Sequence, residues 1–108
     1  MEVDHFVPWA RHPNDAIENL VAAHARCNAS KSDHLAASEH LARWVGRDDA
    51  EAKHLAQIAA DVVWRSEPGL SLSVARGIYL RLPDDTRLWQ RGGSFEAVQH
   101  AKLVELFS

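Results

Sequence analysis

The chain has 108 residues, of which 46% are hydrophobic and 25% charged, and its formal net charge is −3. This composition is typical of one globular domain and excludes a low-complexity or fibrous protein, and no apolar run approaches the roughly 18 residues of a membrane span. An acidic start (Glu2, Asp4) does not fit a signal peptide, so we expect a cytoplasmic protein. Cys27 is the only cysteine, which excludes an internal disulfide.

The first third of the chain predicts a small β-containing head, residues 1–31. Residues 2–7 alternate loosely and end at a proline, which is typical of a short strand. A loop rich in proline, asparagine and aspartate follows. Residues 20–23 are a short apolar run that fits a return strand, although its length alone does not separate strand from helix. Residues 26–32 predict a short helical turn.

The rest of the chain predicts a mostly helical body of three to four helices, because its apolar residues follow a helical period. Proline and glycine residues separate the helices, and Leu88 and Trp89 are expected in a turn region before Gly92 and Gly93. The expected helices are 34–45, ending at Gly46; 50–65, followed by a break at Ser66, Glu67, Pro68 and Gly69; 71–82, ending before Pro83; and 95–107, capped by Ser94.

The fold class is therefore α+β, and we expect one compact domain. Residues 1–47 are expected to form the head with its following helix, and residues 48–108 a helical extension packed on it. Segments shorter than about 40 residues seldom fold alone without a metal, a disulfide or a partner. The head should therefore depend on the helices for its stability.

Polar residues in the head suit phosphodiester hydrolysis, which needs an activated water and a cation beside the phosphate. His5 is suited to be the base, because the ordinary pKa of histidine lies near neutral pH. Asp4 and Asn28 offer oxygen ligands of the kind that Mg²⁺ prefers. Because Asp4 and His5 are adjacent, a strand would direct their side chains to opposite faces.

The spacing of these residues resembles the HNH motif of the ββα-metal nucleases. Thirteen residues separate Asp4-His5 from Asn19, eight more precede Asn28, and Lys31 follows. The flanking words Val-Asp-His-Phe-Val-Pro, Glu-Asn-Leu-Val and Cys-Asn-Ala-Ser-Lys are also similar to those of bacterial and phage HNH proteins. The resemblance covers about 30 residues, with asparagine in place of the last histidine of the motif.

The resemblance implies a ββα-metal head and a role for each matching residue. Asp4 and Asn28 would be metal ligands, His5 the general base and Asn19 the brace of the loop that orients His5. Lys31 would contact phosphate. The cofactor would be a divalent metal, Mg²⁺ first, with Mn²⁺ or another divalent ion as alternatives.

The chain departs from the family at the Cys-x-x-Cys pairs that bind structural zinc in many members. His24 and Cys27 stand where the second pair would be, as a residual zinc pair, and the residues before His5 leave no room for the first. Structural zinc is therefore not expected. Either the chain is a piece of a longer reading frame, or its helical body replaces the zinc knuckle.

The leading function is a metal-dependent endonuclease or nickase acting on DNA, with RNA as an alternative substrate. The net charge counts mildly against a nucleic-acid partner, so binding should be local and metal-assisted. A degenerate HNH remnant, serving as a nucleic-acid-binding or protein-interaction module, is the second hypothesis; a purely helical regulatory partner is the third. The other histidines are expected at the surface and the tryptophans in the core or at helix contacts: His12, His34, His40, His54 and His100; Trp9, Trp44, Trp64 and Trp89.

Overall fold

The protein combines two small antiparallel sheets with a layer of helices, which confirms the predicted α+β class. The computed structural model describes residues 1–67 and 69–108, and of Asp48 and Asp49 only the backbone. In chain order the elements are β1 (Glu2–His5), the 3-10 helix η1 (Ile17–Asn19), β2 (Leu20–Ala23), α1 (Ala25–Lys31), α2 (Ser38–Asp61), α3 (Leu70–Tyr79), β3 (Arg87–Arg91), β4 (Ser94–Ala97) and α4 (His100–Leu106). In the described part of the chain, no helix has the length and apolar character of a membrane span.

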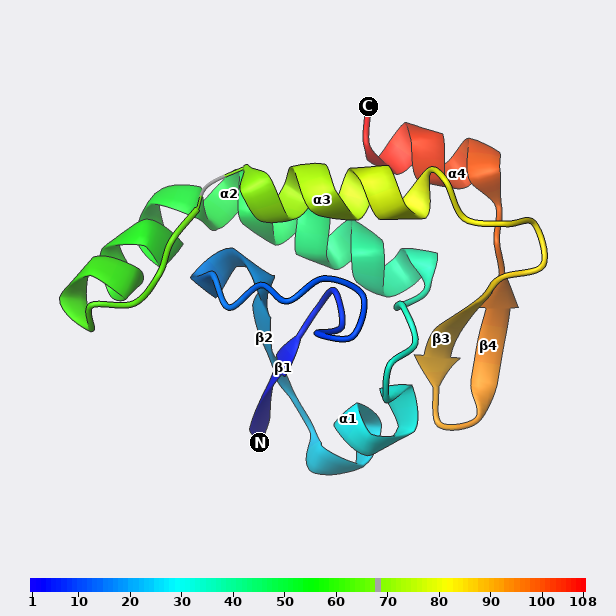
Figure 1. Ribbon diagram of the computed structural model, residues 1–108, viewed down its shortest axis with the longest axis horizontal. Coiled ribbons are helices and arrows are strands. Elements are labelled where there is room, and N and C mark those ends of the chain that lie inside the picture. Colours follow the sequence, from blue (N-terminus) through cyan, green and yellow to red (C-terminus); the bar gives the residue numbers. More distant parts are fainter. Residues whose placement is uncertain (68) are drawn as a thin grey trace.

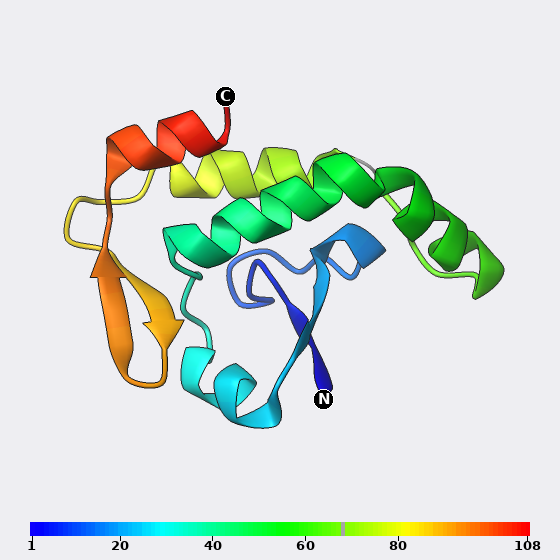
Figure 2. The ribbon, with the colours of Figure 1, turned by 180° about the vertical axis from the view of Figure 1, so that it is seen from behind.

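Helices α2 and α3 form a layer that separates the head from α4 (Figure 1). Strands β1 and β2 lie on one side of this layer, and α4 lies on the other (Figures 1 and 2). The β3–β4 hairpin stands at one end of the molecule beside α1, and the second half of α2 projects at the opposite end. The head therefore has a helix along one side and a hairpin at one end.

The head contains the predicted strand, return strand and short helix. Strand β1 pairs antiparallel with β2, and Asp4 lies opposite Val21 and His5 opposite Leu20. The apolar run at residues 20–23 is thus a strand, because its backbone pairs with β1. The backbone N–H of Phe6 donates to the carbonyl of Asn19 over 2.7 Å and extends the pairing beyond β1.

The predicted end of a helix at Gly46 is wrong, because α2 continues through this glycine to Asp61. The helix is bent at Glu51, whose φ of −123° and ψ of 16° are not helical. Tertiary contacts hold the turn around Gly46, since the Trp44 indole N–H donates to the Glu18 carbonyl over 3.0 Å. These contacts outweigh the low helix propensity of one glycine. Pro68, in the predicted break between helices, lies outside the described residues.

The predicted helix at 95–107, capped by Ser94, is also wrong at its beginning. Residues 94–97 form β4, which pairs with β3, and the helix starts only at His100. Gly92 has a φ of +49°, a conformation that glycine adopts at little cost, and with Gly93 it turns the chain between the strands. The pair of glycines between two short extended segments was the sequence signal for a hairpin.

The linker between α1 and α2 is where the hairpin docks on the rest of the fold. The backbone N–H of Trp89 donates to the carbonyl of Leu35 over 2.8 Å, and that of Ala37 donates to the carbonyl of Trp89 over 2.7 Å. The Tyr79 hydroxyl of α3 donates to the carbonyl of Ala36 over 2.6 Å. These linker residues belong to one buried apolar core, formed by Phe6, Val7, Leu35, Ala36, Ala37, Leu41, Trp44, Ala75, Tyr79, Leu82, Leu88 and Leu103.

Candidate active site

Strand β1 directs its charged side chains to two different places. Glu2 and Asp4, two residues apart, both contact α1: Glu2 Oε1 accepts from Asn28 Nδ2 over 3.0 Å, and Asp4 Oδ2 accepts from Lys31 Nζ over 3.4 Å. His5 contacts Asp15 of the following loop instead. This is the separation that the alternation of a strand predicts for Asp4 and His5.

The His5 imidazole is fixed by two neighbours. Its Nε2 lies 2.6 Å from Asp15 Oδ1, and its ring makes an edge contact with Trp9, with the ring centroids 5.5 Å apart. Because an ionised carboxylate can only accept, Nε2 is the donor when Asp15 is ionised, and the lone pair of the neutral ring is then on Nδ1. The His5 side chain remains 30% exposed, so solvent can reach it.

Asn19 closes the loop that carries Asp15. Its side chain is fully buried and accepts from the backbone N–H of Val7 over 2.9 Å. Its amide nitrogen donates to the carbonyls of Val7 and Asn14, over 3.2 and 3.0 Å. Asn19 thus ties the beginning of the loop to its end, at the position where the resemblance implies a brace.

The body also holds this loop, through the connection between α2 and α3. The Trp64 indole N–H donates to the Asp15 carbonyl over 2.8 Å, and the Ile17 N–H donates to the Arg65 carbonyl over 2.9 Å. The buried Glu18 carboxylate accepts from the Ser66 hydroxyl and the Glu67 N–H, over 2.7 and 2.9 Å. The sequence did not point to Asp15 or Trp64, because no local pattern indicates contacts between residues some 50 positions apart.

Lys31, for which the resemblance implies a phosphate contact, is joined to strand β1 in the structure. It is 6% exposed, and its ammonium also donates to the carbonyls of His5 and Phe6, over 3.3 Å each. Burial lowers the pKa of Lys31 below its ordinary value, and the nearby Asp4 carboxylate raises it in part. The structure therefore gives Lys31 the role of joining Asp4 and the end of β1 to α1.

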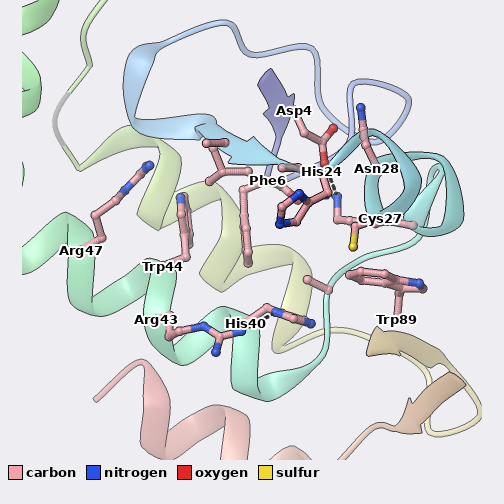
Figure 3. Close-up of a pocket in the computed structure, with 15 residues that line it drawn as sticks. Asp4, Phe6, His24, Cys27, Asn28, His40, Arg43, Trp44, Arg47 and Trp89 are labelled. Carbon is pink, nitrogen blue, oxygen red and sulfur yellow. Dashed lines mark hydrogen bonds and ion pairs between the residues drawn. The ribbon is translucent and has the colours of Figure 1, made fainter. Parts of the chain in front are cut away.

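Asp4 and Asn28 both line a pocket of about 600 Å³ between the head and the body (Figure 3). Strands β1 and β2, α1, α2 and β3 all contribute to its wall. All four tryptophans were expected in the core or at helix contacts. Trp44 and Trp89 are buried, at 3% and 6% exposed, whereas Trp9 and Trp64 are about half exposed, at 52% and 50%. His40 was expected at the surface but is partly buried, with Nε2 donating to the Gln90 carbonyl over 2.6 Å.

His24 and Cys27 line the same pocket without forming a metal cluster. Cys27 is exposed, and His24 stands at the beginning of α1. Within residues 1–67 and 69–108, no three His, Cys, Asp or Glu side chains are grouped closely enough to hold a metal ion. The pair therefore has no third ligand of these types beside it in the part of the chain that the structure describes.

The oxygen atoms around β1 and α1 suit a hard cation better than a soft one. Asp4 offers a carboxylate and Asn28 an amide oxygen, and Glu2, bonded to Asn28, adds a second carboxylate nearby. Mg²⁺ commonly takes one or two carboxylate oxygens and keeps several waters. This donor set fits the divalent metal that the HNH resemblance implies.

Residues 1–37 match the family model of HNH endonuclease, which confirms the resemblance read from the sequence over that stretch. Residues 1–37 are thus similar to a nuclease domain. The comparisons with curated proteins and with solved structures found no match.

Proposed function

We propose that the protein is a metal-dependent endonuclease that hydrolyses phosphodiester bonds, in DNA first. One observation carries the proposal: within the HNH-like stretch, β1 presents Asp4 toward the helix of Asn28 and presents the next residue, His5, to Asp15. A cation site and a base on neighbouring residues can act on the same phosphate from two sides.

Asp4 and Asn28 would hold the divalent cation, with Mg²⁺ as the best fit to their oxygens. The cation, when bound, supplies positive charge against the phosphate and the leaving oxygen. Glu2 orients Asn28 through the bond between Oε1 and Nδ2. Asn28 can therefore turn its carbonyl oxygen toward the cation, because the opposite end of its amide is occupied.

His5 removes a proton from the attacking water. With Nε2 donating to Asp15, Nδ1 of His5 is the atom that accepts this proton. The resulting imidazolium is stabilised by the Asp15 carboxylate, whose Oδ1 lies 2.6 Å from Nε2. Asn19 and Trp64 serve as positioning residues, because their hydrogen bonds fix the loop on which Asp15 lies.

A non-cutting HNH remnant that binds nucleic acid or a protein partner is the second candidate. The observation that favours it is the contact between Lys31 and Asp4, in which an ammonium already neutralises the carboxylate proposed as metal ligand. A remnant would need no divalent cation at this position. The two candidates therefore differ in whether a metal changes what the protein does to nucleic acid.

Supercoiled plasmid, incubated with purified protein and Mg²⁺ or Mn²⁺, tests the proposal. We expect nicking that EDTA stops and that Asp4→Asn lowers by about a hundredfold or more, because the neutral amide holds a cation poorly. Asp84→Asn is the matched control, since this aspartate is 96% exposed on the turn between α3 and β3, outside the head. Nicking that persists in EDTA would contradict the proposal, and binding without nicking under either metal would favour the remnant.

A further inference from the structure

The pocket between the head and the body has the size and lining of a small-molecule site. Its volume of about 600 Å³ lies in the range of about 300 to 1,000 Å³ that is usual for ligand pockets. The rings of Phe6, Trp44, His40 and Trp89 surround the hollow (Figure 3). Such a lining of aromatic rings and a few polar groups is typical of a site for a flat, partly apolar ligand.

The aromatic lining is held rigidly in two stacked pairs. Phe6 and Trp44 stack with centroids 4.4 Å apart and planes 7° apart, and His40 and Trp89 stack at 5.3 Å and 18°. Two further contacts hold the His40 ring, since Nε2 donates to the Gln90 carbonyl over 2.6 Å and Arg43 Nη2 donates to Nδ1 over 2.7 Å. The pocket wall is therefore preorganised and need not rearrange to receive a ligand.

The charges at the pocket favour an anionic ligand, in contrast with the net charge of the chain. Among the described residues that line it, Asp4 is the one acid, and Lys31, Arg43 and Arg47 are bases. Lys31 is engaged by Asp4, and Arg47 Nη1 donates to the Leu20 carbonyl over 2.8 Å. Arg43 has an exposed side chain on α2, so its guanidinium can also meet an anion that enters from solvent.

We propose that this pocket receives the base of an unpaired nucleotide of the substrate strand, with an adjoining phosphate toward Asp4 and Asn28. A nucleotide combines a flat aromatic base with an anionic phosphate, which is what the rings and Arg43 suit. A base within a duplex is stacked and paired, so it can enter only by leaving the helix. The inference rests on the proposed function and adds that its substrate is single-stranded or unpaired beside the cut.

Recognition through a pocket also explains how a chain with a net charge of −3 could bind nucleic acid. Duplex binding by a basic surface depends on many Lys and Arg contacts to phosphates. Binding of one nucleotide in a pocket neutralises few phosphates, and its affinity therefore falls less steeply with salt. The acidic balance of the chain then does not oppose binding, because among the described residues lining the pocket three bases stand against one acid.

Cys27 provides a direct test, because it is the only cysteine of the chain, is exposed and lines the pocket. The rate at which a thiol reagent modifies Cys27 is measured in EDTA, with deoxyadenosine 5′-monophosphate, deoxyribose 5-phosphate or inorganic phosphate. At ten times its dissociation constant, the nucleotide should slow modification about tenfold by mass action. The two phosphates without a base should protect at most weakly.

Arg43→Gln should raise the dissociation constant of the nucleotide, measured by protection of Cys27, about tenfold, because a charge-assisted contact is lost. Arg81→Gln is the control, because Arg81 is exposed and does not line the pocket. In this variant the nucleotide should protect Cys27 as it does in the unaltered protein. Absence of protection at millimolar nucleotide, or equal protection by deoxyribose 5-phosphate, would overturn the inference. Plasmid nicking without protection of Cys27 would overturn only the nucleotide-binding role of the pocket. Protection without nicking would support that role and contradict the proposed endonuclease activity.

Discussion

The head, residues 1–31, and the body, residues 38–108, are stabilised by different kinds of interaction. Among the described residues, the buried polar side chains of the head are Asn14, Glu18, Asn19 and Lys31, and those of the body are the small hydroxyls Ser38 and Ser71. Buried polar groups must be hydrogen-bonded, whereas buried apolar groups need only be packed. The head is thus built to hold particular atoms in place, and the body provides most of the apolar core.

The difference matters because two of the four buried polar side chains of the head, Asn14 and Glu18, are hydrogen-bonded to residues of the body. Asn14 donates to Ser71 of α3 over 2.9 Å, and Glu18 accepts from Ser66 and Glu67. A site of this kind keeps its geometry only while the body is folded against it. The role that the sequence left unassigned to residues 48–108 is therefore, in our account, to hold the loop of Asp15.

Removal of the body should have the largest effect on the stability of the head. We expect the fragment 1–47 to lack cooperative unfolding and dispersed amide signals, because it loses the body partners of Asn14 and Glu18 and the core residues contributed by α3, β3 and α4. Circular dichroism and NMR of the purified fragment measure this directly. A folded, soluble 1–47 fragment would contradict the dependence of the head on the body.

Asn19→Ala should lower the free energy of unfolding by about 3 kcal/mol, because Val7 and Asn14 lose buried hydrogen-bond partners. Denaturant unfolding of the whole chain gives the value. Asn28→Ala is the matched control, whose bond to Glu2 is exposed and should contribute less than about 1 kcal/mol. Equal losses for the two variants would show that burial does not distinguish them.

Tyr79→Phe removes a buried hydrogen bond of the body. It should lower the free energy of unfolding by about 1 to 2 kcal/mol, since the carbonyl of Ala36 loses its donor. Burial raises the pKa of Tyr79 above its ordinary value of 10.0. Below about pH 10 both states hold the phenol proton, and above it the unfolded state releases the proton first. The stability of the unaltered protein should therefore fall as pH rises above about 10, and the part of this fall due to Tyr79 should vanish in Tyr79→Phe.

Gly46→Ala should have the smallest effect and the opposite sign. Gly46 lies within α2, and a Cβ added there would meet no atom within 4 Å. Alanine should therefore raise the free energy of unfolding by about 0.5 to 1 kcal/mol, through its higher helix propensity. A destabilised Gly46→Ala would indicate that the bend near Glu51 needs the freedom of this glycine.

Sequence patterns predicted the head better than the body because the signals of the head are local. The alternation before Pro8 and the spacing of Asp4, His5, Asn19 and Asn28 are contained in about 30 residues. In the body, Gly46 locally indicates the end of a helix, although the contact of Trp44 with Glu18 stabilises a helix that continues through it. Such contacts join residues far apart in sequence, so no local propensity indicates them.

The same limit applies to the candidate site. Asp15 is an ordinary loop residue in the sequence, and only the fold brings its carboxylate to 2.6 Å from His5. The motif indicates a phosphate contact for Lys31, whereas its burial and its contact with Asp4 become visible only in the fold. Motif residues can be read from spacing, whereas their partners depend on the tertiary structure.

The rate of metal-dependent plasmid nicking by His5→Ala tests the central proposal most directly. His54→Ala is the matched control, because His54 is an exposed histidine on α2, in the body. We predict that His5→Ala lowers the rate by about a hundredfold or more while His54→Ala leaves it unchanged, since a general base contributes about 10² to 10⁴. Nicking by His5→Ala at the rate of the unaltered protein would contradict the account.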